Sequence, residues 1–272
     1  MQADIELIVT DLDGTLWELP ASTPEVTRTA LATVLAGEVP LLVATGRRVA
    51  STRAPLADLG VAPPAICLNG ALGLDLTTDD RFHVGGFSAA DAATVLSVFS
   101  NHGVDPCVYV NRDGPSVFVS ATPSTHPDHL RGFGTDVGVA ALDDVIGTDT
   151  VLGFSVLGVD QAVAEALGLD LAGLASPHTD VDRQYGGFSF TVAPPTGSKW
   201  DGIAAFCARE GLDASSVLVM GDGPNDLEML GAAAVAVVPE DAHVDALALA
   251  DHVIGRASLG GWAEILDLLD RV

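Results

Sequence analysis

The sequence predicts an α/β fold, in which a Rossmann-like, doubly wound parallel sheet forms a core that carries an inserted α+β domain. Short apolar runs at residues 7–10, 39–44 and 217–220 are typical of buried strands, and each ends abruptly in polar residues. A helical pattern separates the first two runs, which predicts a βαβ unit with parallel strands. Over residues 76–189 helices alternate with hairpins, which indicates a separate α+β domain.

Size and composition favour a well-packed protein of one large or two modest domains. The chain has 272 residues, of which 48% are hydrophobic. We expect no membrane span, because no apolar run is long enough, and no secretory signal, because the N-terminus lacks its pattern. The cysteines are scattered and odd in number, at Cys67, Cys107 and Cys207, which favours a reducing cytoplasm.

The formal net charge of −25 argues against nucleic acid or an anionic membrane as a partner. The same charge would repel an anionic substrate, so such a substrate would need cations at the site that binds it. Lys199 is the only lysine among the 12 basic residues, and its position is therefore informative.

The first strand ends in two acids, Asp11 and Asp13. Carboxylates at the carboxyl end of a buried strand lie where open α/β sheets bind their ligands. Two close carboxylates repel each other, which favours a shared proton or a bound cation, most simply Mg2+. A plain polar turn is one alternative. A calcium-binding EF-hand loop is another, but Leu16 and Trp17 follow where further oxygen ligands would be needed.

Two more predicted strands end in residues that could contact an anion. One ends in Thr45, Gly46 and Arg47, whose hydroxyl, backbone N–H and guanidinium could donate to phosphoryl oxygens. A helix cap and a surface charge are the alternative interpretations. The other ends in Asn69 and Gly70, a pair that is also typical of a hairpin turn.

The α/β pattern resumes near Lys199, which stands close to a predicted helix start. The helix dipole disfavours a cation there, so carboxylates or a phosphoryl group are its expected partners. The strand at 217–220 then leads into Asp222, Asn225 and Asp226, for which a turn with an N-cap is the alternative.

Taken together, the strand ends supply acids, one lysine, a hydroxyl and an amide: Asp11, Asp13, Thr45, Lys199, Asp222, Asn225 and Asp226. This set fits phosphoryl transfer with Mg2+, because the metal cancels repulsion between carboxylate and phosphate. No Gly-x-x-x-x-Gly-Lys-Ser/Thr loop for a nucleoside triphosphate is present. We therefore expect a carboxylate nucleophile that attacks a phosphomonoester and forms an aspartyl-phosphate, which water resolves.

The sequence resembles the haloacid-dehalogenase-like (HAD) phosphatases, whose four motifs are matched in order by residues 11–16, residues 45–47, Lys199 and residues 221–226. Residues 69–71 and 221–230 resemble the Cof-type branch, which carries a large type IIB cap between the second and third motifs. The resemblance implies a core of residues 1–75 and 190–272 and a cap of residues 76–189. One departure is the bulky Trp200 after the lysine, which puts local packing in doubt.

The resemblance also implies a role for each motif residue. Asp11 is the nucleophile, and Asp13 is the general acid and base. The metal ligands are Asp11, Asp13 through its backbone carbonyl, and Asp222, with Asp226 as a ligand or a support. Thr45 and Lys199 count as catalytic, and the phosphoryl group is bound by Thr45, Gly46, Arg47, Asn69, Lys199 and Asn225.

The cap is expected to close over the site, exclude water and select a sugar phosphate or a similar small phosphomonoester. Its candidate selectors are residues 122–134, Arg183 and Tyr185. His126 and His129, three apart in that segment, could suggest a metal, but a loop is the favoured interpretation. A phosphomutase of the phosphomannomutase type and an inactive binding protein are the alternative functions. We expect a monomer or homodimer.

Overall fold

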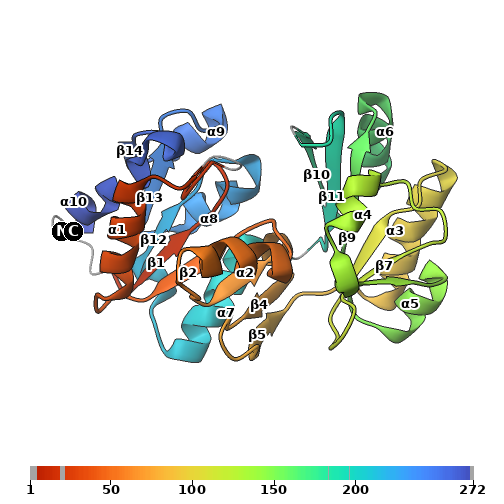
Figure 1. The fold of residues 1–272 in the computed structure, drawn as a ribbon, viewed down its shortest axis with the longest axis horizontal. Coiled ribbons are helices and arrows are strands. Elements are labelled where there is room, and N and C mark those ends of the chain that lie inside the picture. The colour runs from red at the N-terminus through yellow and green to blue at the C-terminus, as the bar shows by residue number, and fades with distance from the viewer. Residues whose placement is uncertain (1–4, 19–21, 183, 196, 270–272) are drawn as a thin grey trace. The chain divides into compact units, whose positions relative to one another are not determined.

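The computed structural model describes residues 5–18, 22–182, 184–195 and 197–269 (Figure 1). The chain forms two compact units: a core unit of Met1–His83 with Ser198–Val272, and a cap unit of Val84–Gly197. These bounds differ from those expected from the sequence at both boundaries: residues 190–197 lie in the cap unit, and the segment of residues 76–83 lies in the core unit. Its strand β5 (Arg81–Val84) joins the core sheet, and Phe82 packs on the core cluster.

The core unit is built on a sheet of eight strands in the order β14-β13-β12-β1-β2-β3-β4-β5. Neighbouring strands run parallel from β14 to β3, and β4 is antiparallel to β3. The predicted doubly wound parallel sheet is therefore confirmed, with an antiparallel addition at one edge. Besides β5, its strands are β1 (Leu7–Thr10), β2 (Leu41–Ala44), β3 (Ala65–Cys67), β4 (Leu72–Leu74), β12 (Val217–Met220), β13 (Val235–Pro239) and β14 (His252–Ile254).

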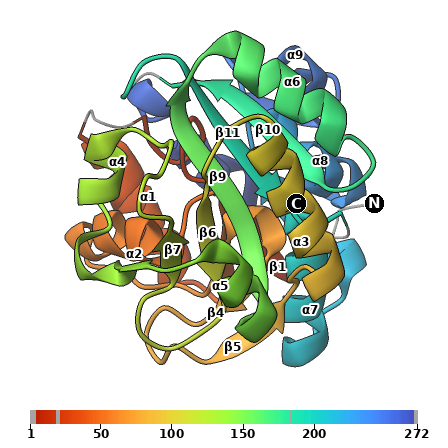
Figure 2. The same ribbon diagram turned by 90° about the vertical axis from the view of Figure 1, so that its right-hand side faces the viewer.

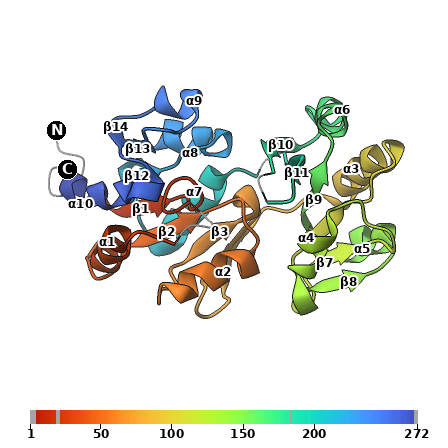
Figure 3. The same cartoon turned by 45° about the horizontal axis from the view of Figure 1, so that its top comes forward.

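Helices cover both faces of this sheet, with α1 and α2 on one side and α8 and α9 on the other (Figure 3). The α-helices are α1 (Glu25–Leu35), α2 (Val49–Asp58), α7 (Lys199–Glu210), α8 (Leu227–Ala232), α9 (Val244–Leu247) and α10 (Ile265–Leu269). The 3-10 helices are η1 (Leu68–Gly70), η3 (Ala214–Ser216), η4 (Pro224–Asp226), η5 (Ala257–Leu259) and η6 (Gly261–Glu264). Helix α1 begins after Pro24, which is its N-cap residue.

Strands β1 and β12 are buried along their whole length, as their apolar sequences predict. They pair in parallel with Thr10 opposite Met220, and the N–H of Asp11 donates to the carbonyl of Met220 at 2.9 Å. The register therefore brings the residues after both strands to the same edge of the sheet.

The cap unit is an α+β layer with a sheet of six strands in the order β10-β11-β9-β6-β7-β8 (Figure 2). The strands are β6 (Cys107–Val110), β7 (Val117–Val119), β8 (Val137–Val139), β9 (Val151–Val159), β10 (Ser176–Val181) and β11 (Phe188–Ala193). Its helices are α3 (Ala89–Asn101), α4 (Pro127–Arg131), α5 (Leu142–Thr148) and α6 (Gln161–Leu171), and one 3-10 turn, η2, spans Gly134–Asp136. Apart from the parallel β7–β8 pair, its paired strands run antiparallel.

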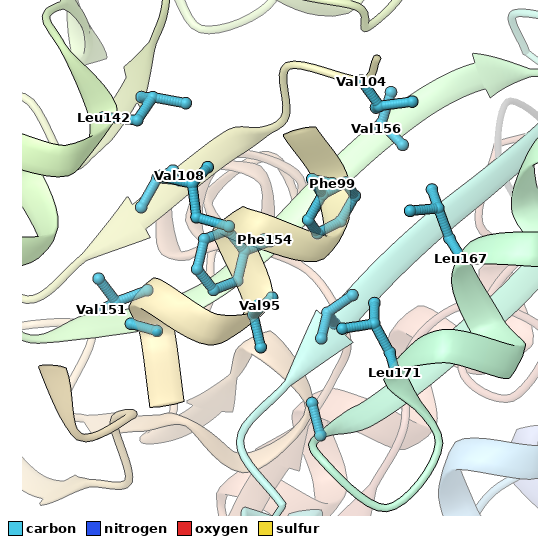
Figure 4. Close-up of a cluster of buried hydrophobic side chains, with 14 of the residues drawn as sticks. Val95, Phe99, Val104, Val108, Leu142, Val151, Phe154, Val156, Leu167 and Leu171 are labelled. Atoms are coloured by element: carbon cyan, nitrogen blue, oxygen red, sulfur yellow. The ribbon is translucent and has the colours of Figure 1, made fainter. Parts of the chain in front are cut away.

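The cap unit has a hydrophobic core of its own (Figure 4). Phe154 of β9 lies 5.9 Å from Phe99 of α3 between ring centroids and 5.5 Å from Phe87. Leu167 and Leu171 of α6 belong to the same cluster, so α3 and α6 are fixed to one face of the sheet.

The segment around His126 is helical rather than a loop. His126 is the N-cap of α4, because its Nδ1 accepts the N–H of Asp128 at 3.1 Å. The expectation of a loop is therefore wrong for Pro127–Arg131.

No helix in the described part of the chain is both long and apolar enough to cross a membrane.

Candidate active site

The candidate site is a cluster of three carboxylates, Asp11, Asp222 and Asp226, at the carboxyl edge of the core sheet. Each offers an oxygen atom, and these oxygens all lie within 4.8 Å of one another. Asp11 is 6% exposed and Asp226 is fully buried. A search of the acidic, histidine and cysteine side chains in the described part of the chain finds this group with the spacing of a metal site. The strand ends predicted to converge do so.

Lys199 supplies the positive charge inside the cluster. Its Nζ donates to Asp11 Oδ1 and to Asp226 Oδ1, each at 2.7 Å, and its side chain is 1% exposed. It is the first residue of α7, where the helix dipole opposes its charge. Ser198 and Asp201 form a capping box that satisfies this helix start. The carboxylate partners expected for the lysine are present.

Both carboxylate oxygens of Asp226 accept hydrogen bonds from the protein. Lys199 engages its Oδ1, while its Oδ2 accepts the backbone N–H of Asp222 at 3.0 Å and that of Gly223 at 2.9 Å. These bonds fix the loop that carries Asp222. Among the two functions expected for Asp226, the geometry favours support over direct metal binding.

Asp11 and Asp222 each use only one carboxylate oxygen in the described side-chain contacts of the cluster. Lys199 engages one oxygen of Asp11, and the hydroxyl of Thr15 donates to Asp222 Oδ1 at 3.1 Å. In the described structure this leaves the second oxygen of each carboxylate for a cation. Two hard oxygen donors beside a third carboxylate fit Mg2+, which is commonly bound by one or two carboxylates and retains water.

The electrostatics of the cluster also favour an added cation. Burial raises the pKa of Asp11 well above its usual value, and the charges of Asp226 and Asp222 add to this against the opposing effect of Lys199. Burial and the charge of Asp226 raise the pKa of Asp222 to about 7. Burial alone would lower the pKa of Lys199, but Asp11 and Asp226 outweigh it and raise that pKa. One ammonium thus does not balance three carboxylates.

Asp13 is not a member of this cluster and makes its own set of contacts. Arg47 donates to both of its carboxylate oxygens, from Nε to Oδ2 and from Nη2 to Oδ1, the latter at 2.6 Å. The indole N–H of Trp17 donates to Oδ1 at 3.1 Å. Arg47, expected as a phosphate contact or a surface charge, is therefore an ion-pair partner of Asp13 in this structure.

Thr45 and Gly46 lie on a tightly held loop after β2. Thr45 is 1% exposed, and its Oγ1 accepts the N–H of Arg47 at 3.2 Å. The N–H of Leu68 donates to the carbonyl of Arg47, and the N–H of Asn69 to that of Thr45. A Cβ at Gly46 would come within 2.9 Å of Asn69 Oδ1, so only glycine fits without a shift.

Asn69 connects two loops of the site. It lies in the turn between antiparallel β3 and β4, and its Oδ1 accepts Nδ2–H of Asn225 at 3.0 Å. Leu68 and Asn69 both adopt left-handed backbone, with φ of 53° and 55°. Such strain in non-glycine residues is typical of functional turns. The hairpin turn and the site contact, which were alternatives, occur together.

Two contributors to the site were not assigned from the sequence: Thr15 and Trp17. Thr15 lies inside the first motif and Trp17 follows it directly, so the signal available in the sequence was a polar and an aromatic residue close to the acids. Trp262, near the end of the chain, donates its indole N–H to Thr10 Oγ1 at 3.0 Å. Nothing local in the sequence points to that contact.

The cap candidates come from two segments that meet. His126 stacks on Tyr185 with ring centroids 5.0 Å apart, and His129 lies 5.9 Å from the same ring. His129 also contacts Thr125 through Nδ1 at 2.9 Å. Arg183, the remaining candidate, lies outside the described residues.

A comparison with known families decides what kind of protein carries this site. Residues 8–266 match the model of the haloacid dehalogenase-like hydrolase family. The chain belongs to the haloacid dehalogenase-like hydrolases. The family predicted from the four motifs is confirmed, and with it the prediction that the chain is an enzyme of the hydrolase class.

Two relatives are similar to this HAD-like hydrolase along nearly the whole chain. YkrA of Bacillus subtilis, which is named as a phosphatase, is 27% identical over 92% of both chains. Pyridoxal phosphate phosphatase YbhA of Escherichia coli is 25% identical over 96% of this chain and 97% of its own.

Solved structures share the fold. A haloacid dehalogenase-like hydrolase from B. subtilis has a TM-score of 0.79 at 18% identity and covers 97% of this chain and 100% of its own. The HAD subclass IIB sugar phosphatase BT4131 has a TM-score of 0.75 at 19% identity and covers 98% of this chain and 100% of its own. The predicted fold with an inserted α+β cap is confirmed.

We predict that the metal-free protein becomes less stable as pH rises from about 4 to 7. The pKa of Asp222 is about 7 in the folded state, against 3.8 for the free group, so the folded state retains a proton that the unfolded state loses. Mg2+ at this site would bind the ionised carboxylate, so we expect its stabilising effect to grow with pH. The measurement is the melting temperature with and without Mg2+ at about pH 5 and about pH 8.

The variant Asp222→Asn removes the titrating group. It should abolish the fall in melting temperature with pH that is assigned to this group, and also the rise in melting temperature on addition of Mg2+. Asp58→Asn makes the same charge change at an exposed position and should retain both. A gain from Mg2+ that is equal at the two pH values, or unchanged in Asp222→Asn, would contradict the assignment.

Proposed function

We propose that this chain is a Mg2+-dependent phosphatase that hydrolyses a small phosphomonoester through an aspartyl-phosphate on Asp11. The observation that carries the proposal is the position of Asp11. It is buried, its Oδ1 is held by Lys199 at 2.7 Å, and it lies beside Asp222 in the carboxylate cluster. A carboxylate fixed in this way, next to the ammonium of Lys199, is suited to attack an anionic phosphoryl group.

Asp11, Asp222 and the backbone carbonyl of Asp13 would hold Mg2+, which supplies charge neutralisation between the carboxylate and the phosphoryl group. Asp226 supports the loop of Asp222, as its three hydrogen bonds indicate. Lys199 shields the carboxylates from one another and is available to a phosphoryl oxygen. Thr45, Gly46, Asn69 and Asn225 line the neighbouring loops as further donors: the Thr45 hydroxyl, the Gly46 backbone N–H and the side-chain amides.

The reaction has two steps. In the first, a carboxylate oxygen of Asp11 forms a bond to phosphorus, the phosphorus–ester oxygen bond breaks, and Asp13 gives a proton to the leaving oxygen. In the second, Asp13 takes a proton from water, the water oxygen bonds to phosphorus, and the bond to Asp11 breaks. Inorganic phosphate is released, and both aspartates return to their starting states.

The substrate class is inferred from the relatives. YbhA is named for pyridoxal phosphate and BT4131 for a sugar phosphate, and both are small phosphorylated metabolites. We infer a sugar phosphate or a similar metabolite, selected by cap residues such as His126, His129 and Tyr185. The three free cysteines are all buried, in keeping with a reducing cytoplasm, and we infer a monomer or homodimer.

We predict that Asp11→Asn abolishes phosphate release while leaving the fold intact, because an amide lacks the nucleophilic oxygen. The measurement is phosphate release from a panel of sugar phosphates and other phosphomonoesters with Mg2+, together with circular dichroism of the variant. Asp58→Asn is the control for the loss of one acidic charge. Near-normal turnover by Asp11→Asn would exclude the covalent route, and an isomeric phosphate ester in place of free phosphate would indicate a mutase.

We predict that Lys199→Met lowers kcat/KM by about 100-fold or more, because the cation that faces the transferring group is lost. The same change leaves buried carboxylates without their partner and should lower the free energy of unfolding by about 3–5 kcal/mol. Urea unfolding and phosphate release measure the two effects. Lys199→Arg keeps the charge and should lose less stability than Lys199→Met. An unchanged rate in Lys199→Met would leave the lysine without a catalytic function.

A further inference from the structure

Trp17 is placed by a turn that folds back on the first motif. Its N–H donates to the carbonyl of Leu12 at 3.0 Å, and its carbonyl accepts the N–H of Gly14 at 2.8 Å. Gly14 has a φ of 84°, and a Cβ there would overlap the carboxylate of Asp222. The turn therefore requires glycine, and it fixes Trp17 in the core with 1% of its surface exposed.

Asp13 is held by two side chains that differ in kind. Trp17 donates its indole N–H to Oδ1 at 3.1 Å, and Arg47 donates to Oδ1 and to Oδ2. The side chain of Arg47 is 25% exposed, and a guanidinium binds phosphate as readily as carboxylate. A phosphomonoester dianion therefore competes with Asp13 for Arg47. Trp17 is neutral, rigid and buried, so the same anion does not draw it away.

The two donors differ in which carboxylate oxygens of Asp13 they contact, and this difference decides which oxygen stays held when Arg47 leaves. Trp17 contacts only one oxygen of Asp13, Oδ1. If Arg47 turns toward a bound phosphoryl group, Trp17 still holds Oδ1, and Oδ2 is left to face the ester oxygen.

We propose that Trp17 is a positioning residue for Asp13, whose indole N–H fixes Oδ1 so that Oδ2 exchanges the proton with the leaving ester oxygen and with water. This inference rests on the proposed phosphatase function. It assigns to Trp17 an effect on proton transfer in addition to its packing.

A consequence that packing alone would not produce is a dependence on the leaving group. Phenyl phosphate and p-nitrophenyl phosphate have the same ring, but p-nitrophenolate is much the weaker base and leaves without a donated proton. Phenolate, with a conjugate-acid pKa near that of tyrosine at about 10, needs the proton. Misdirection of Asp13 should therefore slow phenyl phosphate hydrolysis more than p-nitrophenyl phosphate hydrolysis.

The experiment compares kcat/KM for the two esters with Mg2+ in the wild-type enzyme and in variants. Trp17→Phe removes the indole N–H. Replacement of Trp17 by 3-benzothienylalanine removes the same donor from a ring system of nearly equal size, and it carries the test if Trp17→Phe does not fold. Trp262→Phe is the matched control, because Trp262 is also fully buried and donates its indole N–H to Thr10 rather than to Asp13.

We expect both Trp17 variants to lower kcat/KM for phenyl phosphate about tenfold more than for p-nitrophenyl phosphate. Trp262→Phe should leave the ratio of the two values as in the wild type. An unchanged ratio in the Trp17 variants would overturn the inference while the phosphatase function stands. Failure of the wild-type enzyme to release phosphate from either ester or from any phosphomonoester of the panel would overturn the proposed function and this inference with it.

Discussion

The site depends on negative charge that is concentrated inside the protein. Asp11, Asp222 and Asp226 bring their oxygens within 4.8 Å of one another, and a single buried ammonium, that of Lys199, lies against two of them. Burial disfavours ionised carboxylates, and their mutual repulsion adds to the cost. The fold sustains this cluster because the parallel strands β1 and β12, which are buried along their whole length, end at the same edge of the sheet.

Because this buried charge must be held in place, some residues near the cluster serve to fix the proposed reacting residues. Asp226 uses both oxygens on Lys199 and on the backbone of its own loop, so it serves to fix Asp222. Asn69 ties the loop of Asn225 to the turn after β3 at the expense of left-handed backbone. Asp13 lies outside the cluster, held by Arg47 and Trp17. The nucleophile and the proton donor of the proposed reaction thus have different hydrogen-bond partners.

Much of the site could be predicted because strand ends follow from simple patterns. The apolar runs that end just before Asp11 and Asp222 place both acids at one edge of the sheet. Lys199, the only lysine of the chain, stands at a predicted helix start that disfavours a cation, which indicated acidic partners. The partners of Asp13 could not be predicted, because they depend on the turn at Gly14 and on side-chain directions. The expected core boundary at residue 75 differs from the structure because β5 pairs with its neighbour β4 at the edge of the core sheet and Phe82 packs on the core cluster.

The central claim is that Asp11 and Asp222 share one divalent cation. The most direct measurement is anomalous X-ray diffraction from crystals of the enzyme grown with Mn2+, which takes the oxygen ligands of Mg2+ and can be located by its scattering. We expect one strong peak within coordination distance of a carboxylate oxygen of each residue. A peak elsewhere, or carboxylates of Asp11 and Asp222 too far apart to contact the same ion, would contradict the account.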